Sequence, residues 1–310
     1  MQKPIVTVVY QKDDWDMTVP FSNPLYRDAY EKLYTVAAER GIKMTRASMH
    51  WLTNKGFSRG WTFENGTWKK IKAFKPGLIW DKSPYRISLL PKKRRLHRQF
   101  PVINSIALEQ IVSDKFLTHL IFPKFTAKTF VVHNRQEAKQ AAKQIPSKQV
   151  VLKPSVGTGG KNVRIISKRA INTQRIKPFT LIQEYLDASK GIPNLTPGHH
   201  DLRVTLMNGK VLYSSIRKPP KGSRIANIAR GGSYEIIPVR KIPAAVRKIT
   251  KEVDTLLKPV GDRYYSVDFI YSRGRPYVVE LNGTPGVDVP EKLQDRIYHQ
   301  LVSFFENFLD

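Results

Sequence analysis

The chain has 310 residues, 41% of them hydrophobic and none of them cysteine, so it is long enough for two or three domains and lacks disulfides, thiolate zinc sites and cysteine nucleophiles. No apolar run approaches the roughly 20 residues that span a bilayer, and the N-terminal residues lack a signal-peptide cleavage site, so we expect a cytoplasmic protein. The 53 basic and 25 acidic residues give a net charge of +28, which attracts nucleic acid, nucleotides, acidic peptides or anionic membranes without distinguishing among them.

The first hundred residues alternate between strand and helix patterns. We expect strands at residues 5–10, 42–47 and 77–80, a hairpin over 61–70, and helices over 24–40 and 83–98. Strand–helix–strand order predicts an α/β unit with a parallel sheet. The last of these helices carries the densest basic cluster, for which a solvated helix face is favoured over a nucleic-acid site. That cluster consists of Lys92, Lys93, Arg94, Arg95 and Arg98.

The rest of the chain predicts two further lobes. A helix is expected to begin near Ser113, followed by short strands and one helix up to residue 183. Residues 201–237 are rich in strand patterns, and a helix, a hairpin and a final helix follow. The predicted strands are 129–133, 150–153, 163–166 and 180–183, and the predicted helices are 136–144, 242–257 and 290–308. We therefore expect three domains, at residues 1–103, 104–185 and 186–310.

A glycine-rich segment lies between two predicted strands. Gly157, Gly159 and Gly160 allow backbone amides to approach an anion closely, which is typical of a phosphate cradle. A dinucleotide fingerprint or a P-loop would require a helix next, but Asn162 and a strand pattern follow, so both are disfavoured. The segment is either a glycine-rich hairpin that covers phosphates or a plain flexible hairpin tip.

Two lysines and a strand end adjoin this loop. Lys153 ends the preceding strand and Lys115 opens an upstream helix, and both can reach phosphates as point charges, although surface lysines are common in so basic a chain. Residues 181–186 form an apolar strand edge that can offer adenine a backbone donor and acceptor. Glu184 or Asp187 would then bind the ribose, although a buried strand ending in a turn fits this segment equally well.

The predicted hairpin at residues 265–283 sets two acids against each other. If its turn centres on Gly274, Asp268 lies opposite Glu280, and Asn282 points to the same face. Opposed carboxylates repel unless a cation lies between them, and a small set of oxygen ligands suits Mg²⁺ that carries nucleotide phosphates. Alternatively, one acid points outward beside an arginine of the turn, such as Arg273 or Arg275.

In chain order, these segments resemble the ATP-grasp superfamily of carboxylate–amine ligases over residues 104–286, especially its glutathione-synthetase-like and RimK-like branch. The resemblance implies an α/β (α+β) ATP-grasp fold, with an N-terminal α/β domain and two α+β lobes that clasp ATP and Mg²⁺, with Mn²⁺ as an alternative ion. The implied metal ligands are Asp268, Glu280 and Asn282. The implied ATP-binding residues are Lys115, Lys153, Gly157, Thr158, Gly159, Gly160, Gln183, Glu184, Tyr185, Leu186 and Asp187.

The implied reaction joins a carboxylate to an amine through an acyl phosphate, with release of ADP and phosphate. Guanidinium forks match carboxylate and phosphoryl groups, and an amide can orient the acyl phosphate. The candidate catalytic residues are Arg203, Arg217, Asn227 and Arg230. A noncatalytic nucleotide-binding scaffold and a polyanion-binding or nucleic-acid-binding protein remain as alternatives.

The expected partners are a small-molecule or peptide carboxylate and an amine, acidic ones being weakly favoured by the basic charge. Nucleic acid is not required, and related ligases suggest a homo-oligomer. Residues 188–200 are longer and richer in proline and glycine than the family pattern. His199 and His200 could suggest a metal pair, but adjacent residues of an extended chain point to opposite faces, so a loop that lines the substrate entrance is favoured.

Overall fold

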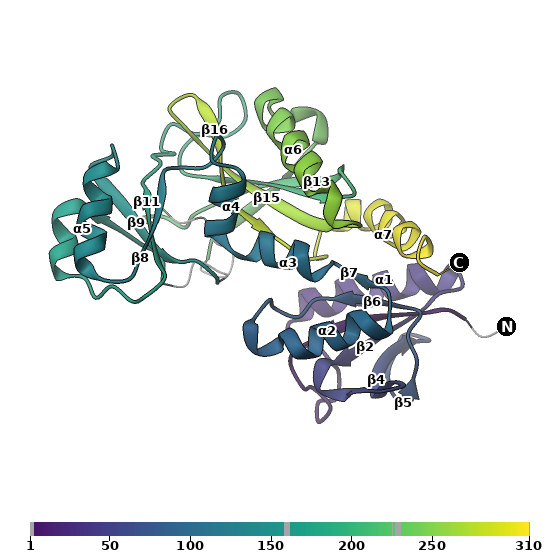
Figure 1. Cartoon of the computed structure of the whole chain (residues 1–310). Helices are drawn as coiled ribbons and strands as arrows, with labels where there is room; N and C mark the ends of the chain where they lie inside the picture. The colour runs from purple at the N-terminus through teal and green to yellow at the C-terminus, as the bar shows by residue number, and fades with distance from the viewer. Residues whose placement is uncertain (1–2, 158–161, 225, 227–230, 310) are drawn as a thin grey trace. The chain divides into compact units, whose positions relative to one another are not determined.

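The computed structural model describes residues 3–157, 162–224, 226 and 231–309, and Figure 1 shows its elements in chain order. The chain groups into two compact units. The first holds residues up to 109 with 260–264 and 284 onward, and the second holds 110–259 with 265–283. The final helix thus groups with the N-terminal residues, whereas the predicted division assigned it to the third domain. That three-part division stays a prediction.

The first unit is built on a seven-stranded sheet with the order β3-β4-β2-β1-β6-β7, in which β5 pairs with β4. The predicted parallel core is confirmed, because β2, β1, β6 and β7 run parallel, while β4 joins them antiparallel. Its elements are β1 (Ile5–Tyr10), α1 (Pro24–Glu39), β2 (Lys43–Ser48), η1 (Met49–Trp51), β3 (Leu52–Thr53), β4 (Gly56–Glu64), β5 (Thr67–Phe74), β6 (Leu78–Asp81), η2 (Ile87–Leu89), α2 (Leu90–Gln99), β7 (Val102–Ile103) and α7 (Glu291–Glu306).

The predicted first helix is confirmed and has clear local causes. The Asn23 side chain accepts a hydrogen bond of 3.0 Å from the Leu25 N–H, and Pro24 occupies the first turn, where its missing N–H costs nothing. The helix buries Tyr30 and Leu33 on one face, and α7 packs beside it. Arg40, the residue that follows α1, stabilises the packing of the two helices by donating a hydrogen bond to the Glu306 carboxylate.

The predicted helix over 83–98 begins later than expected. The α-helix starts at Leu90, directly after the short 3₁₀ helix η2, because Pro91 is tolerated only in a first turn and would break an α-helix that began at residue 83. The basic cluster on this helix is not uniformly solvated either. Lys93 is fully buried, where it pairs with Asp81 at 2.6 Å and with Glu109 at 2.8 Å. Helical spacing places Lys93 on the inner face, so the expectation of a solvated face was wrong for this residue.

The second unit contains two antiparallel sheets. The order of one is β10-β9-β11-β8, and the order of the other is β14-β13-β12-β15-β16. The predicted strands at 129–133, 150–153, 163–166 and 180–183 are confirmed as β8, β9, β10 and β11. Its elements are α3 (Ile106–Ser113), α4 (Lys115–Ile121), β8 (Thr129–Val132), α5 (Arg135–Gln144), β9 (Gln149–Pro154), β10 (Arg164–Ser167), η3 (Lys168–Thr173), β11 (Thr180–Glu184), β12 (Asp201–Met207), β13 (Lys210–Lys218), β14 (Ser233–Ile237), η5 (Val239–Lys241), α6 (Ala244–Leu257), η6 (Lys258–Val260), β15 (Tyr264–Ser272) and β16 (Arg275–Asn282).

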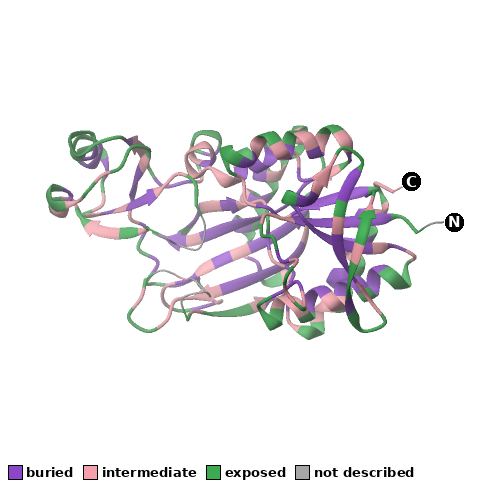
Figure 2. Cartoon of the chain, turned by 90° about the horizontal axis from the view of Figure 1, so that it is seen from below, coloured by how far each residue is buried: buried purple, intermediate pink, exposed green. Residues whose placement is uncertain are grey.

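The segment around Ser113 holds two helices where the sequence predicted one. Helix α3 ends at Ser113, and Asp114 then caps α4 by accepting hydrogen bonds from the Phe116 and Leu117 N–H groups at 2.8 and 3.3 Å. The cap places Lys115 at the first position of α4, as predicted. Figure 2 shows that buried residues concentrate on the strands, while the outer faces of the helices are exposed.

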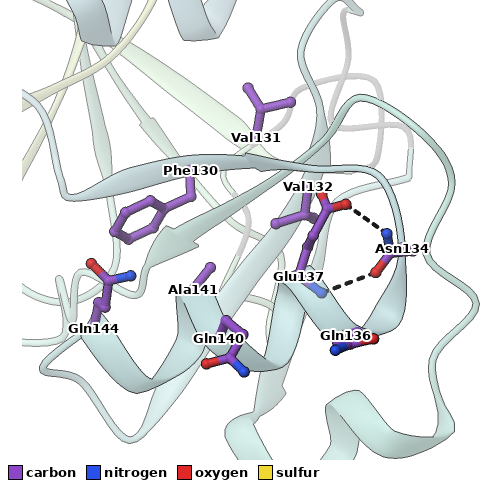
Figure 3. Close-up of a pocket in the computed structure, with 9 residues that line it drawn as sticks. All are labelled: Phe130, Val131, Val132, Asn134, Gln136, Glu137, Gln140, Ala141 and Gln144. Atoms are coloured by element: carbon purple, nitrogen blue, oxygen red, sulfur yellow. Dashed lines mark hydrogen bonds between the residues drawn. The ribbon is translucent and has the colours of Figure 1, made fainter.

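A pocket of about 390 Å³ lies between β8 and α5 (Figure 3). Its one acidic side chain, Glu137, is used in a capping box with Asn134: the Asn134 amide donates to Glu137 at 2.6 Å, and the Glu137 N–H donates back at 3.0 Å. The remaining lining residues are apolar or carry amides. None belongs to the predicted site, and the pocket offers no reactive group.

The turns that flank β4 predict a sharp contrast between two glycines. Gly56 has φ +132°, and a Cβ there would lie 2.2 Å from the Phe74 carbonyl oxygen, whereas Gly66 has φ +72° with open space around it. We expect Gly56→Ala to lower the free energy of unfolding by about 3 kcal/mol and Gly66→Ala by about 1 kcal/mol. Denaturant unfolding of both variants measures this. Equal losses would contradict the predicted backbone clash.

Candidate active site

The β15–β16 hairpin places Asp268 opposite Glu280, as predicted, but its turn and its strand register differ from those expected. Its turn has two residues, Arg273 and Gly274, both with positive φ (52° and 75°), and is not centred on Gly274 alone. That turn by itself would set Asp268 against Val279. A β-bulge next to Asp268 shifts the register by one residue and so restores the pairing of the two acids.

The three predicted metal ligands lie together. The Asn282 amide nitrogen donates to the Asp268 carboxylate at 3.3 Å and to the Glu280 carboxylate at 3.5 Å. Asp268 is fully buried, whereas the Glu280 side chain keeps 24% of its surface exposed. The structure therefore brings two carboxylates and one amide to a single point that solvent reaches from the side of Glu280.

Two arginines from neighbouring strands hold Asp268. Arg203 on β12 donates to both carboxylate oxygens at 2.7 and 2.6 Å, and Arg217 on β13 donates to one of them at 2.6 Å. A bidentate guanidinium is a strong and directional partner for a carboxylate. Arg217 also donates to Asp201, which faces it in the β12–β13 register. Asp201 is not among the site residues expected from the sequence.

The pKa values of Asp268 and Asp201 are shifted in opposite directions. Burial alone would raise the pKa of Asp268, but the Arg203 and Arg217 guanidinium groups lower it to about 2. Burial and the adjacent Asp268 carboxylate raise the pKa of Asp201 to about 7. Two buried atoms, Asp201 Oδ1 and Arg217 Nε, have no hydrogen-bond partner among the described residues. A polar ligand at this point would satisfy both.

The predicted phosphate lysines approach the same cluster. Lys115 Nζ donates to the Gly157 carbonyl at 2.6 Å and lies 3.5 Å from the Glu280 carboxylate. Lys153 is buried and donates to the Gln183 side chain at 2.8 Å. Burial, and then the neighbouring Lys115 ammonium, lower the pKa of Lys153 to about 8, although Glu280 opposes this shift. An anion would stabilise the charged form of Lys153.

The predicted adenine hinge is partly occupied by internal contacts. Gln183 bridges Lys153 and Thr129, since its amide nitrogen donates to the Thr129 hydroxyl at 2.7 Å, and it therefore positions the lysine. Glu184 pairs with Arg273 at 2.5 Å. The turn arginine thus pairs with the hinge, and neither Asp268 nor Glu280 turns outward to it. A ribose-binding role for Glu184 stays a prediction.

The remaining predicted hinge residues come directly after Glu184 in the chain. The Tyr185 N–H donates to the Ser147 hydroxyl at 3.2 Å, Leu186 is buried, and the Asp187 carboxylate accepts from the Ser189 N–H at 3.0 Å. Asp187 remains exposed and open to a ligand. The other predicted site residues, Thr158, Gly159, Gly160, Asn227 and Arg230, lie outside the described residues.

The two adjacent histidines do not form a metal pair. His200 is buried, with Nδ1 2.9 Å from the Gly198 carbonyl and Nε2 3.0 Å from the Tyr271 N–H, so both ring nitrogens are used. The carbonyl contact requires a proton on Nδ1, which leaves Nε2 to accept. This histidine fastens residues 198–200 to β15 and has a structural role.

The residues present fit a hard divalent cation. Within the described ranges, no three His, Cys, Asp or Glu side chains gather as a complete cage. Asp268 and Glu280 instead offer carboxylate oxygens, and Asn282, whose amide nitrogen faces them here, would add its amide oxygen after rotation of the side chain. Such a small all-oxygen set suits Mg²⁺ because Mg²⁺ keeps several waters or phosphate oxygens among its ligands. In the part of the chain that is described, no helix combines the length and apolar content needed to cross a membrane.

The comparisons with known proteins agree with this geometry. Residues 114–286 match the model for "Prokaryotic glutathione synthetase, ATP-grasp domain". The chain is 26% identical over 216 residues to a "Probable alpha-L-glutamate ligase" of Thioalkalivibrio sulfidiphilus, a match that covers 67% of each chain. Matches to two further glutamate ligases cover 57% of their lengths, so the chain spans 57% to 67% of the length of these three curated relatives.

Two solved structures show the same fold. The D-cycloserine synthetase DcsG superposes with a TM-score of 0.68 at 15% identity, covering 97% of this chain and 99% of that one. The ATP-grasp ligase PsnB, complexed with a phosphomimetic variant of its minimal precursor, Mg and ADP, superposes with a TM-score of 0.62 at 14% identity, covering 100% of both chains.

The fold and the site define an ATP-grasp protein of the α/β class, which confirms the resemblance drawn from the sequence. More closely, the chain belongs to the family of prokaryotic glutathione synthetase ATP-grasp domains, since the family model matches more than half of it. The named relatives are ligases that form C–N bonds, and the class uses ATP and Mg²⁺.

Stability measurements test the charge arrangement around Asp268. Asp268→Asn removes a buried carboxylate that receives three hydrogen bonds from two arginines, and we expect it to lower the free energy of unfolding by about 3–5 kcal/mol at pH 7. The pKa of Asp268 is depressed, so its contribution in the wild type is present above pH 3.8 and is lost as the pH falls through about 2.

Asp201→Asn is the matched comparison. The pKa of Asp201 is raised, so the folded wild type holds a proton that the unfolded chain has lost, and this makes wild-type stability fall between pH 3.8 and about 7. The variant lacks that loss, and its stability relative to wild type should rise over this range. A pH series of denaturant curves measures both variants. A parallel pH dependence in wild type and Asp201→Asn would contradict this account.

Proposed function

We propose that this chain is an ATP-dependent carboxylate–amine ligase that works through an acyl-phosphate intermediate. The observation that carries the proposal is the convergence of opposed acids, phosphate-reaching lysines and paired arginines within one unit of a chain from this family. A noncatalytic scaffold would have no use for a buried carboxylate next to a second acid, because each costs desolvation energy. A nucleic-acid-binding protein leaves the same acids unexplained.

In the proposed reaction, a substrate carboxylate oxygen attacks the terminal phosphorus of ATP, and the P–O bond to ADP breaks. The amine nitrogen then attacks the acyl carbon, the C–O bond to phosphate breaks, and the amine loses a proton. The first step converts an oxygen that cannot leave into a phosphate that can. Such chemistry depends on positioning and on neutralising charge more than on a protein nucleophile.

The lysines, the arginines and the acidic side chains of the candidate site each have a separate proposed role. Lys115 and Lys153 would hold the phosphates, since both lie at the base of the glycine-rich segment. Arg203 and Arg217 would bind the carboxylate and the phosphoryl group that forms on it, using donors such as the unpartnered Arg217 Nε. Mg²⁺ held by Asp268, Glu280 and Asn282 would neutralise phosphate charge. Asn227 and Arg230 keep their predicted catalytic roles as proposals.

The substrates are proposed only by class. A carboxylate and an amine, either small molecules or peptides, fit the glutamate ligases among the relatives and a ligase of similar fold that was solved with a precursor peptide. An acidic substrate, a homo-oligomer and a cytoplasmic location stay predictions. The net charge of +28 supports the first of these only through long-range attraction.

Turnover of site variants tests the proposal. Asp268→Asn and Glu280→Gln each remove one charge from the metal set, and we expect at least about a hundredfold loss of ADP release with a mixture of amino acids and dipeptides. Glu252→Gln, on the exposed face of α6, is the charge-matched control and should keep wild-type turnover. Hydroxylamine should trap the acyl phosphate as a hydroxamate, identified by mass spectrometry. Normal turnover by both site variants would reject the assignment.

Proton uptake tests the role of Lys153. Its pKa of about 8 leaves about three quarters of the free protein without this charge at pH 8.5, and a bound triphosphate would restore it. Nucleotide binding should therefore take up protons at pH 8.5, more than at pH 6.5, and affinity should fall as the pH rises through 8.

Calorimetry in buffers of different ionisation enthalpy measures this uptake. Lys153→Arg keeps a permanent charge and is the control, which should bind nucleotide without the proton uptake at pH 8.5. Equal uptake by wild type and Lys153→Arg would show that another group titrates and that Lys153 does not contact the phosphates.

A further inference from the structure

A second concentration of cations lies in the first unit, on one face of the ribbon formed by β4 and β5. In the antiparallel register, Arg59 faces Lys72 and Trp61 faces Lys70, so these side chains share one face of the ribbon. We call Arg59, Lys70 and Lys72 the ribbon cations. None of them belongs to the candidate active site.

Tryptophan rings hold two of these cations in place. The Arg59 guanidinium lies 5.1 Å from the centre of the Trp15 ring and 5.3 Å from that of Trp51, and the Lys70 ammonium lies 5.1 Å from the Trp15 ring and 5.2 Å from the Trp61 ring. Cation–π contacts of this kind keep a cation near the surface without neutralising it. The arrangement thus preorganises positive charge.

The ribbon cations form no close ion pair within the described residues. None of the ion pairs within 4.0 Å among the described residues involves Arg59, Lys70 or Lys72. Asp13, the acid beside this face, accepts hydrogen bonds from the Trp51 indole N–H at 3.0 Å and the Trp15 N–H at 3.1 Å, and its charge interacts with Arg59 at longer range. A single carboxylate offsets at most one of the three ribbon cations. Like charges directly opposed on a ribbon repel each other, so Arg59 and Lys72 would be stabilised by an external anion.

Helix α2 extends the basic surface. Lys92 contacts His50 at 3.1 Å, next to Trp51, and Arg95 donates to the Asn54 side chain at 2.7 Å, in the turn before β4. Lys92 and Arg95, which are half-buried, therefore connect the basic cluster on α2 to the end of the ribbon. The cations of α2 and of the ribbon together outnumber those that a single small anion needs.

The ribbon also offers a sheet edge. Strand β5 pairs only with β4 among the described strands, so its outer backbone groups face away from the sheet. Lysines on an edge strand often serve to block aggregation, and this would explain Lys70 and Lys72 alone. It does not explain Arg59, which lies on the inner strand β4, nor the tryptophans that hold it.

We propose that this face of the β4–β5 ribbon docks an extended acidic peptide, which adds to the β5 edge and places alternate carboxylates against the ribbon cations. Strand addition supplies main-chain hydrogen bonds, and side chains at alternate positions supply specificity. Single-stranded nucleic acid needs exposed aromatic faces on which bases stack. Here Trp51 and Trp61 are buried, and Trp15 is flanked by two cations, so carboxylates fit the surface better than bases do.

Fluorescence anisotropy with a labelled peptide of about ten residues, with glutamate at alternate positions, tests the docking site on the full chain. We expect measurable binding at low salt, and the triple variant Arg59→Gln, Lys70→Gln, Lys72→Gln should weaken it at least about tenfold. The control triple Lys139→Gln, Lys143→Gln, Lys248→Gln removes the same charge from exposed positions on α5 and α6, and it should change affinity by less than about twofold.

Further probes separate the alternatives. A glutamine version of the peptide should not bind, and N-methylation at alternate residues should weaken binding because it removes strand pairing. The single variant Lys72→Gln, at an exposed position, should lose about threefold and covers the case in which the triple variant fails to fold.

Several results would overturn the proposal. An equal loss in the control triple would mean that only net charge matters. A thymidine oligonucleotide of equal charge that binds more tightly, and loses binding in the same ribbon variants, would assign the surface to nucleic acid. Unchanged binding of the N-methylated peptide would remove the strand pairing. The proposal is independent of the proposed ligase reaction, because the assay measures no turnover.

Discussion

The candidate site depends on one constraint, which is that the Asp268 carboxylate is completely buried and must be neutralised. An unpaired charge in such a position would cost several kcal/mol, so its surroundings follow from it. Strands β12 and β13 each supply an arginine that points at Asp268, and β16 supplies Asn282. A cation between Asp268 and Glu280 would complete the same compensation.

This constraint links the two sheets of the second unit. Lys115, at the start of α4, reaches both the Gly157 carbonyl after β9 and the Glu280 carboxylate on β16. A main-chain hydrogen bond also links the two sheets, because the Val278 N–H on β16 donates at 2.7 Å to the carbonyl of Phe125, in the segment that leads into β8. A ligand that changes the charge between Lys115 and Glu280 therefore acts on both sheets together, which suits a site that must hold phosphates during a transfer step.

Periodic patterns predicted most of the strands and helices, because burial of one face leaves a regular mark on the sequence. They also placed the acids of the hairpin, although for an incomplete reason. The two-residue turn and the bulge beside Asp268 each shift the register, and the shifts cancel; no pattern in β16 marks the bulge. Side-chain contacts between residues far apart in the sequence could not be predicted either. The burial of Lys93 depends on Glu109, and the contact of Gln183 with Lys153 depends on sheet order.

The two basic regions differ in how their charge is compensated, and this difference separates their roles. In the candidate site, Arg203 and Arg217 meet Asp268 and Asp201, so the cations there hold a fixed geometry and contribute little free field. On the ribbon, Arg59 and Lys70 are held by rings that do not cancel their charge. The attraction expected from a net charge of +28 should thus act more through surfaces such as the ribbon than through the site. An acidic partner would then bind at the ribbon, where the cations are not paired with carboxylates, and this binding would not depend on which substrate reacts in the candidate site.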